Sequence, residues 1–328
     1  MRRVSENQTT RNLVSYALEN KRRVGEFSRQ LTTGLKVEKP SDSIDAGTIS
    51  RYQQQIAKID TYNSTIAQAK SFLQFQDDIV SQTSQLLVRA NEIAQQGANE
   101  TLNEFSRSQL AEEVFQIRDQ MASLANSTYQ GKYVYGGVDD DDPPYDLQAY
   151  AEPATGDANK RYVFDAEPGT DVSKTVRVSD EISVTLNTPA DQVFGTAMQA
   201  LERLSRALAG YSTTPASGTP DGGGAAYTFP GDFHTQTADI KACIDLLNFA
   251  RDKEMIPERV ALGGRLRRIE TGTALLELTK NSAKEALSRL QDADEAEAAS
   301  NLQQAQTALQ ASYSVTAKVL RLSILDYV

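Results

Sequence analysis

Both ends of this 328-residue chain carry an apolar stripe at helical spacing, and this feature limits the possible folds most. The N-terminal stripe alternates steps of three and four residues through Leu13, Ala17, Asn20, Val24, Phe27 and Leu31. The C-terminal stripe repeats this spacing in Leu302, Ala305, Leu309, Ser312, Thr316 and Val319. A lone helix with one apolar face is marginal in water, although either segment could also lie on a globular core. Because both ends carry a stripe, we predict that they pair with each other and with copies of the chain.

The composition favours long helices over a thick globular core. Aromatic residues make up 7% of the chain, Trp is absent, and 39% hydrophobic residues stand against 24% charged ones. Thin helical packing needs fewer apolar residues per unit length. The net charge of -10 argues against nucleic-acid binding, which depends on Lys and Arg at phosphates. We interpret the basic residues near the N-terminus as a solvated helix face rather than a polyanion site.

Residues that usually build catalytic or metal sites are scarce. Cys243, the single cysteine, lies in an apolar helical pattern and is predicted to be a buried structural thiol. His234, the single histidine, lies in a Gly/Pro-rich loop. Asp139 to Asp142 lack the alternating spacing and the glycine of a calcium loop, so we interpret them as a solvated turn. No nucleophile, base and orienting group come together, and we expect no enzyme activity, cofactor or metal.

Long helices are predicted through the middle of the chain. Gly34 can cap the first helix, Pro40 stops it, and Ser41 or Asp42 can cap the next. That helix is expected from about Ile44 to Gln96, a rod of roughly 75 Å at 1.5 Å per residue. Its apolar positions recur every seven residues in Ile59, Ile66, Leu73, Val80, Leu87 and Ala94. A helix of this length favours a spacer or a bundle member.

Further helices and a small β-rich region follow. Thr101 with Glu104 predicts a capping box for a third helix. Helical spacing also covers Leu110–Leu124, Phe194–Leu208, Ile240–Ala250 and, as the cleanest heptad, Leu262–Leu290. Gly131–Gly137 is predicted to hold a short aromatic strand between glycines. Period-two patterns predict strands in Tyr162–Phe164, Val176–Val178 and Ile182–Leu186. The stretch Ser212–Phe233, with Gly222–Gly224 and three prolines, is predicted to be a flexible loop.

Several motifs resemble the bacterial flagellin superfamily. Ser28–Val37, followed by Pro40–Ser43, is similar to the flagellin N-terminal pattern. Asp292–Glu297, followed by Leu302–Ser312, is similar to the C-terminal one. Within the superfamily, Gly131–Gly137 with Pro143–Pro144 downstream resembles the branch that joins hook to filament more than the filament flagellins. The ending Lys318–Val328 resembles that branch too.

This resemblance implies a mainly α fold, a long-helix coiled-coil bundle built from both chain ends with a small inserted β-rich domain. Residues 1–43 would form an N-terminal assembly helix that pairs with a C-terminal assembly helix, residues 291–328. Residues 44–137 and 190–290 would form a helical rod domain, and residues 138–189 the outer β-rich insertion.

The resemblance also implies partners and a location. The expected partners are other copies of the chain in a ring or tube, the first hook-associated protein, flagellin, a chaperone at the C-terminal segment, and the flagellar type III export apparatus. We expect neither nucleic acid nor a membrane as a partner. The first thirty residues show no apolar core of a cleavable signal peptide, and no run of about twenty apolar residues occurs. By itself this indicates a cytoplasmic protein and leaves open export through an uncleaved N-terminus. The resemblance implies export by that apparatus to the hook-filament junction.

We predict that the assembly interface consists of Leu13, Ala17, Asn20, Val24, Phe27, Leu31, Leu302, Ala305, Leu309, Val319, Leu320 and Ile324. Asn20 would fix the register, as a single polar residue in a seam can, or would be a surface residue without consequence. Two other interpretations stay open: a divergent flagellin that builds the filament itself, and a cytoplasmic coiled-coil scaffold.

Overall fold

The computed structural model describes residues 2–37, 45–137, 140–149, 160–164, 174–213, 226–229 and 231–325, with the backbone alone for 2–7, 9–10, 149 and 319–325. Its helices are α1 (Arg2–Thr33), α2 (Ala46–Gly97), α3 (Glu104–Ala125), α4 (Ala190–Leu208), α5 (Phe233–Phe249), the π-helical segment η3 (Ala250–Met255), α6 (Ile256–Gln291) and α7 (Glu295–Leu325). Its strands are β1 (Thr128–Tyr129), β2 (Lys132–Tyr133), β3 (Tyr145–Ala149), β4 (Lys160–Phe164), β5 (Thr175–Arg177) and β6 (Ser183–Thr185). The predicted mainly α fold with paired ends and a small β-rich insertion is confirmed.

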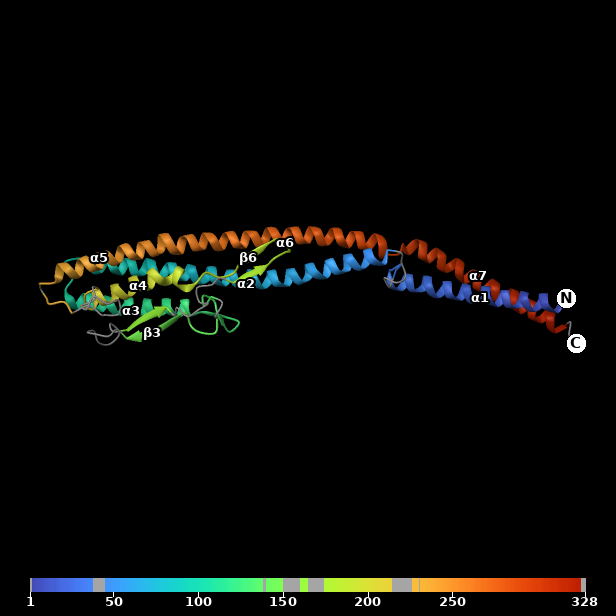
Figure 1. Ribbon diagram of the computed structural model, residues 1–328, viewed down its shortest axis with the longest axis horizontal. Helices are drawn as coiled ribbons and strands as arrows, with labels where there is room; N and C mark the ends of the chain where they lie inside the picture. The colour runs from blue at the N-terminus through green and yellow to red at the C-terminus, as the bar shows by residue number, and fades with distance from the viewer. Residues whose placement is uncertain are drawn as a thin grey trace. The chain divides into compact units, whose positions relative to one another are not determined.

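Contacts divide the chain into two units. The first holds Met1–Asp60 and Glu277–Val328, and the second holds Thr61–Leu276. In the first unit α1 and α7 lie side by side, and both chain termini lie at the same end of this pair (Figure 1). The narrower domain boundaries expected from the sequence, at residues 43 and 291 and around 138–189, stay predictions.

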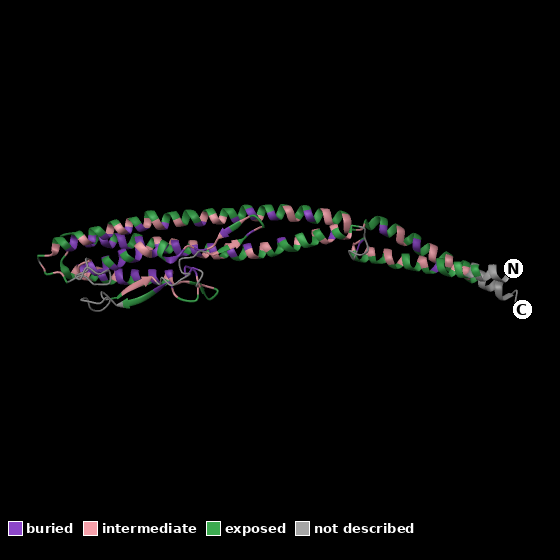
Figure 2. Ribbon diagram, in the orientation of Figure 1, coloured by how far each residue is buried: buried purple, intermediate pink, exposed green. Residues whose placement is uncertain are grey.

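The first two helices begin and end close to where the sequence predicts. Gly34 follows α1 with φ +71, a left-handed conformation that glycine adopts without strain, and its N–H donates to Gln30 O over 2.8 Å. Pro40, Ser41 and Asp42, the predicted stop and caps, lie outside the described residues. The residues of α2 that recur every seven positions from Ile59 to Ala94 are each at most 4% exposed. This confirms that one face of the helix is buried (Figure 2).

The N-terminus of α3 differs from the prediction. Asn103, not Thr101, caps this helix, and its side-chain oxygen accepts from Ser106 N over 2.8 Å. The Thr101 N–H and hydroxyl instead donate to Asn99 Oδ1. Asn at the N-cap position is as strong a cap as Ser or Thr, and it lies next to the first helical residue, Glu104. The predicted capping box was therefore wrong, while the helix it introduced is confirmed.

The core of the second unit lies where α4 packs against α3 and α5. Phe194, Leu201 and Leu204 of α4 are fully buried. At the end of α2, Gly97 leaves room for this packing, since a Cβ built there would lie 2.5 Å from Leu208 Cδ2. The absence of a side chain at Gly97 therefore permits close contact between these elements.

The helix α5 continues through η3 into α6 without a loop, whereas the sequence suggested separate helices. Pro257 lies in the first turn of α6, where its missing N–H would interrupt regular α-helical bonding. The π-helical turns of η3 come directly before it, and such turns occur as local insertions in α-helices. His234 lies in the first turn of α5 rather than in a loop, with 87% of its side chain exposed.

The strands form three separate antiparallel pairs. Gln130 (φ 53) and Gly131 (φ 82) form the two-residue turn between β1 and β2, so the predicted strand Gly131–Gly137 is reduced to Lys132–Tyr133. The strands β4, β5 and β6 lie in the predicted β-rich stretch. The strand β3, which the sequence analysis did not predict, pairs with β4 over five residues. Residues 214–225 and 230 of the predicted loop Ser212–Phe233 lie outside the described residues.

Candidate subunit interface

The terminal helices α1 and α7 form an antiparallel pair. Asn20 bonds with Ser312, while Leu35, just after α1, forms an antiparallel bridge with Asp292, just before α7. Residue numbers therefore rise along one helix as they fall along the other. The pairing predicted from the two stripes is thus present within a single chain.

Backbone hydrogen bonds hold the two helices together where α1 ends and α7 begins. Lys36 N and Val37 N both donate to Gln291 O, over 2.7 and 3.2 Å, and Ala293 N donates to Gly34 O over 2.9 Å. The Asp294 carboxylate then accepts from the N–H groups of Ala296 and Glu297, two of the donors left free in the first turn of α7. The backbone hydrogen bonds between the end of α1 and the start of α7 therefore fix the position of the two helices relative to each other.

The predicted seam faces into the pair as far as its side chains are described. Ala17 and Ala305 are buried, at 9% and 6% exposure. The other described seam residues are half-buried, namely Leu13, Asn20, Val24, Phe27, Leu31, Leu302 and Leu309. The side chains of Val319, Leu320 and Ile324 lie outside the described part. That these residues also contact other subunits stays a proposal.

Asn20 meets a polar partner in the seam. Its amide nitrogen donates to Ser312 Oγ over 2.9 Å, and that hydroxyl donates to Ala308 O over 2.8 Å, one turn back along α7. Ser312 lies on the stripe predicted for the C-terminal helix, so the two predicted seams meet at their polar positions. A polar pair of this kind penalises slipped alignments, because a shift would place the amide against apolar side chains.

Sequence reasoning missed a second face of α1, which points away from the seam. Val14 and Leu18 are 44% and 62% exposed. A signal for this face exists in the sequence: Val14 and Leu18 are four residues apart and so share one side of the helix, outside the predicted seam. An isolated exposed leucine needs no explanation, but neighbouring large apolar residues on a slender pair of helices indicate a contact surface.

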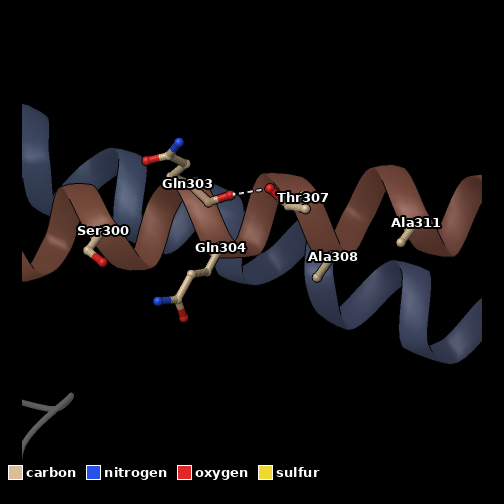
Figure 3. A pocket seen from close by; sticks show the side chains of 6 residues that line it. All are labelled: Ser300, Gln303, Gln304, Thr307, Ala308 and Ala311. Carbon is tan, nitrogen blue, oxygen red and sulfur yellow. Dashed lines mark hydrogen bonds between the residues drawn. The ribbon is translucent and has the colours of Figure 1, made fainter.

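A shallow groove runs along the outer side of α7. Its lining consists of Ser300, Gln303, Gln304, Thr307, Ala308 and Ala311 (Figure 3). The Thr307 hydroxyl donates to Gln303 O over 2.9 Å, so this hydroxyl is already satisfied within the helix. From Ala298 to Ala317 the sequence contains no charged residue. The groove is therefore uncharged, which suits contact with another helix better than binding of an ion.

Metal-binding groups and a reactive thiol were sought among the described residues. Among them, no three His, Cys, Asp or Glu side chains are grouped to hold a metal ion. Cys243 is buried, as predicted, and burial raises the pKa of its thiol to about 12, which suppresses the reactive thiolate. Within the described part, no helix is both long and apolar enough to span a membrane.

Comparisons with known proteins agree with this arrangement. Residues 4–139 match the model of the bacterial flagellin N-terminal helical region, and residues 251–328 match that of the bacterial flagellin C-terminal helical region. The two matches together cover more than half of the chain, in the same order as in flagellins, and they contain the helices that pair. The chain belongs to the bacterial flagellin family.

A similar curated protein is the flagellar hook-associated protein 3 of Salmonella typhimurium, 31% identical over 129 residues, which are 37% of this chain and 38% of that protein. Among solved structures, a putative flagellar hook-associated protein of Vibrio parahaemolyticus has a TM-score of 0.59 at 18% identity, covering 76% of this chain and 99% of the other. The flagellar junction protein FlgL of Legionella pneumophila has a TM-score of 0.52 at 15% identity, covering 68% and 99%. The structural likenesses establish the fold.

Proposed function

We propose that this chain is a structural component of the bacterial flagellum that joins the hook to the flagellin filament. The observation that carries the proposal is the antiparallel α1–α7 pair, which is formed by the segments that match the two flagellin terminal models. The names of the relatives in Salmonella and Legionella, a hook-associated protein and a flagellar junction protein, support the junction rather than the filament.

In this role the chain would act by assembly and not by catalysis. Its proposed partners are further copies of itself, the first hook-associated protein on the hook side and flagellin on the filament side. Before assembly, a chaperone would hold the C-terminal segment, and the flagellar type III apparatus would export the chain to the hook-filament junction. A helix that leaves apolar residues exposed in the free chain can bury them only when such neighbours arrive.

Deletion of the gene tests the role directly. Electron microscopy is expected to show hooks without filaments, and the culture medium is expected to contain flagellin monomers, because flagellin would be made and exported but could not attach. Hooks that keep filaments made of another flagellin would indicate that this chain is an accessory flagellin. An unchanged flagellum would overturn the proposal and favour the cytoplasmic scaffold.

A matched pair of variants tests the seam within this role. Leu309→Asp places a charge at a half-buried seam position, and Gln310→Asp places the same charge on the exposed neighbouring residue. An unpaired buried charge is far costlier than an exposed one. In the deletion strain, Leu309→Asp should fail to restore filaments while Gln310→Asp restores them. Restoration by both variants would contradict the proposed interface.

A further inference from the structure

The π-helical segment η3 carries a carboxyl group that reaches a neighbouring helix. Glu254 lies near the C-terminal end of this segment, beside Met255, which is fully buried. The segment packs against α4, and the Glu254 Oε1 atom accepts a hydrogen bond from the hydroxyl of Thr196 on that helix. π-helical turns are rare and often coincide with functional sites. A titratable side chain therefore joins η3 to α4 at an irregular point of the helical run from α5 to α6.

Only one of the two carboxyl oxygens of Glu254 is hydrogen-bonded within the described part of the chain. The second oxygen, Oε2, is buried and has no hydrogen-bond partner among the described residues. A charged carboxylate normally accepts hydrogen bonds on both oxygens or pairs with a cation, and burying it without these partners costs free energy. A carboxyl group that carries a proton is neutral, and it is therefore much less costly to bury in such a place.

The titratable groups around Glu254 make its charged form still less favourable. Asp191, near the start of α4, is a second carboxylate that acts on it through space. Tyr145 of β3 has a buried hydroxyl without a hydrogen-bond partner among the described residues. The carboxylates that act on this tyrosine are Asp191, Glu202 and Glu254. Burial and the Asp191 carboxylate raise the pKa of Glu254, although the hydrogen bond from Thr196 opposes them, and no described Lys or Arg offsets the effect.

We propose that Glu254 is a proton-dependent lock between η3 and α4. With a proton bound, the side chain is neutral and η3 packs closely against α4. Without the proton, a partly buried negative charge lies near the Asp191 carboxylate, and the contact between the two elements loosens. The lock belongs to the second unit and not to the α1–α7 pair, so this inference goes beyond the proposed junction role and does not depend on it.

The direction of the pH dependence follows from the raised pKa of Glu254. A carboxyl group whose pKa is higher in the folded chain than in the unfolded chain binds more protons in the folded state between the two values. Its stabilising effect is complete below the ordinary pKa of 4.5 and is lost as the pH rises through the folded value. Asp252 on the same segment acts in the opposite direction, because its hydrogen bond from Arg251 lowers its pKa. The contact of η3 with α4 should therefore be tightest in acidic solution.

Hydrogen exchange of the η3 amides in the purified full-length chain tests the lock. The Glu254→Gln variant imitates the protonated side chain at every pH, because an amide stays neutral. Native and variant chains are compared at pH 4 and at pH 8, each time at the same pH, since the intrinsic exchange rate changes with pH. Glu112→Gln is the matched control, because it removes the same charge from an exposed position of α3 in the same unit.

At pH 8 the η3 amides of Glu254→Gln should exchange more slowly than those of the native chain, by about tenfold for each unit by which folding raises the pKa. At pH 4 the two chains should exchange at the same rate, and Glu112→Gln should match the native chain at both pH values. Equal rates at pH 8, faster exchange in Glu254→Gln, or a difference that is the same at pH 4 and pH 8 would overturn the proposal.

Infrared titration of the native chain gives a second measurement that does not depend on how a variant folds. The carbonyl band of a protonated carboxyl should persist above pH 4.5, the ordinary pKa, and should be missing from Glu254→Gln. Thr196→Val removes the hydroxyl that favours the charged form and should move the loss of the band to higher pH. Thr196→Ser keeps a hydroxyl and should leave the titration nearly unchanged. Complete loss of the band by pH 4.5 in the native chain would refute the lock.

Discussion

Replacing Asn20 by leucine is expected to stabilise the α1–α7 pair even though it removes a hydrogen bond. The lost bond, from the amide to Ser312 Oγ at 2.9 Å, contributes about 1 kcal/mol. Ser312 keeps its donor bond to Ala308 O, so no buried donor loses its partner. A leucine packed in the seam contributes about 2 kcal/mol through burial of its side chain. The pair should therefore become about 1 kcal/mol more stable, whereas Asn20→Ala, which loses the bond and adds no burial, should make it about 1 kcal/mol less stable.

Hydrogen exchange of the α1 amides in the purified full-length chain measures this difference. A change of about 1 kcal/mol alters the protection factors about fivefold, upward for Asn20→Leu and downward for Asn20→Ala. Asn12→Leu is the matched control, because Asn12 is exposed and its replacement should leave protection unchanged. Faster exchange in both Asn20 variants would refute the packing inferred for the seam.

The same variants separate stability from register. A purely apolar seam accepts slipped alignments that the polar pair excludes. Asn20→Leu is therefore expected to restore fewer hook-filament junctions than the native chain in the deletion strain, despite its more stable α1–α7 pair. Full restoration would show that Asn20 does not set the register.

Three further predictions concern the packing of the second unit. Arg107→Met should lower the free energy of unfolding by about 3 kcal/mol in urea unfolding, because the fully buried guanidinium donates to Gln236 and Thr237. Arg89→Met, which removes an exposed ion pair, is the control and should leave the free energy of unfolding nearly unchanged. Gly97→Ala should cost about 1–3 kcal/mol in the same assay and Gly264→Ala, which has open space, should gain about 1 kcal/mol; equal effects would contradict the packing at Gly97. The raised pKa of Cys243 leaves little thiolate at pH 8, so alkylation should be about a thousandfold slower than at an exposed cysteine, as mass spectrometry can measure.

The long helices could be predicted because a heptad pattern kept over many turns directly reports one buried face. Leu262, Ile269 and Ala283 of α6 are buried at the seven-residue spacing seen in the sequence, with Leu276 only 8% exposed between them. The end of α1 could be predicted for a different reason, namely that Gly34 adopts a left-handed conformation that other residues avoid. Both signals are local, so no knowledge of the tertiary structure was needed.

Features that depend on distant partners could not be predicted. Arginine is rarely buried, and nothing near Arg107 in the sequence indicates that Gln236 and Thr237 would surround its guanidinium. Burial also lowers the pKa of this guanidinium from its ordinary value, because the charged form loses hydration. The strand β3 escaped prediction for the same reason, since its pairing with Lys160–Phe164 supplies the hydrogen bonds that define it.

The two faces of α1 together explain why this pair of helices suits assembly better than an independent existence. The seam is satisfied within one chain through Asn20 and Ser312, so α1 and α7 can find each other without a second copy. Yet Leu18 stays 62% exposed beside Val14, on a face that no part of the same pair covers. If pairing with α7 buried every apolar side chain of α1, no apolar surface would remain to bind a neighbouring copy. An unpaired α1 would instead expose too much apolar surface to stay soluble. The division of α1 into an internal seam and an exposed apolar face at Val14 and Leu18 therefore fits a subunit that is preorganised alone and assembles with further copies.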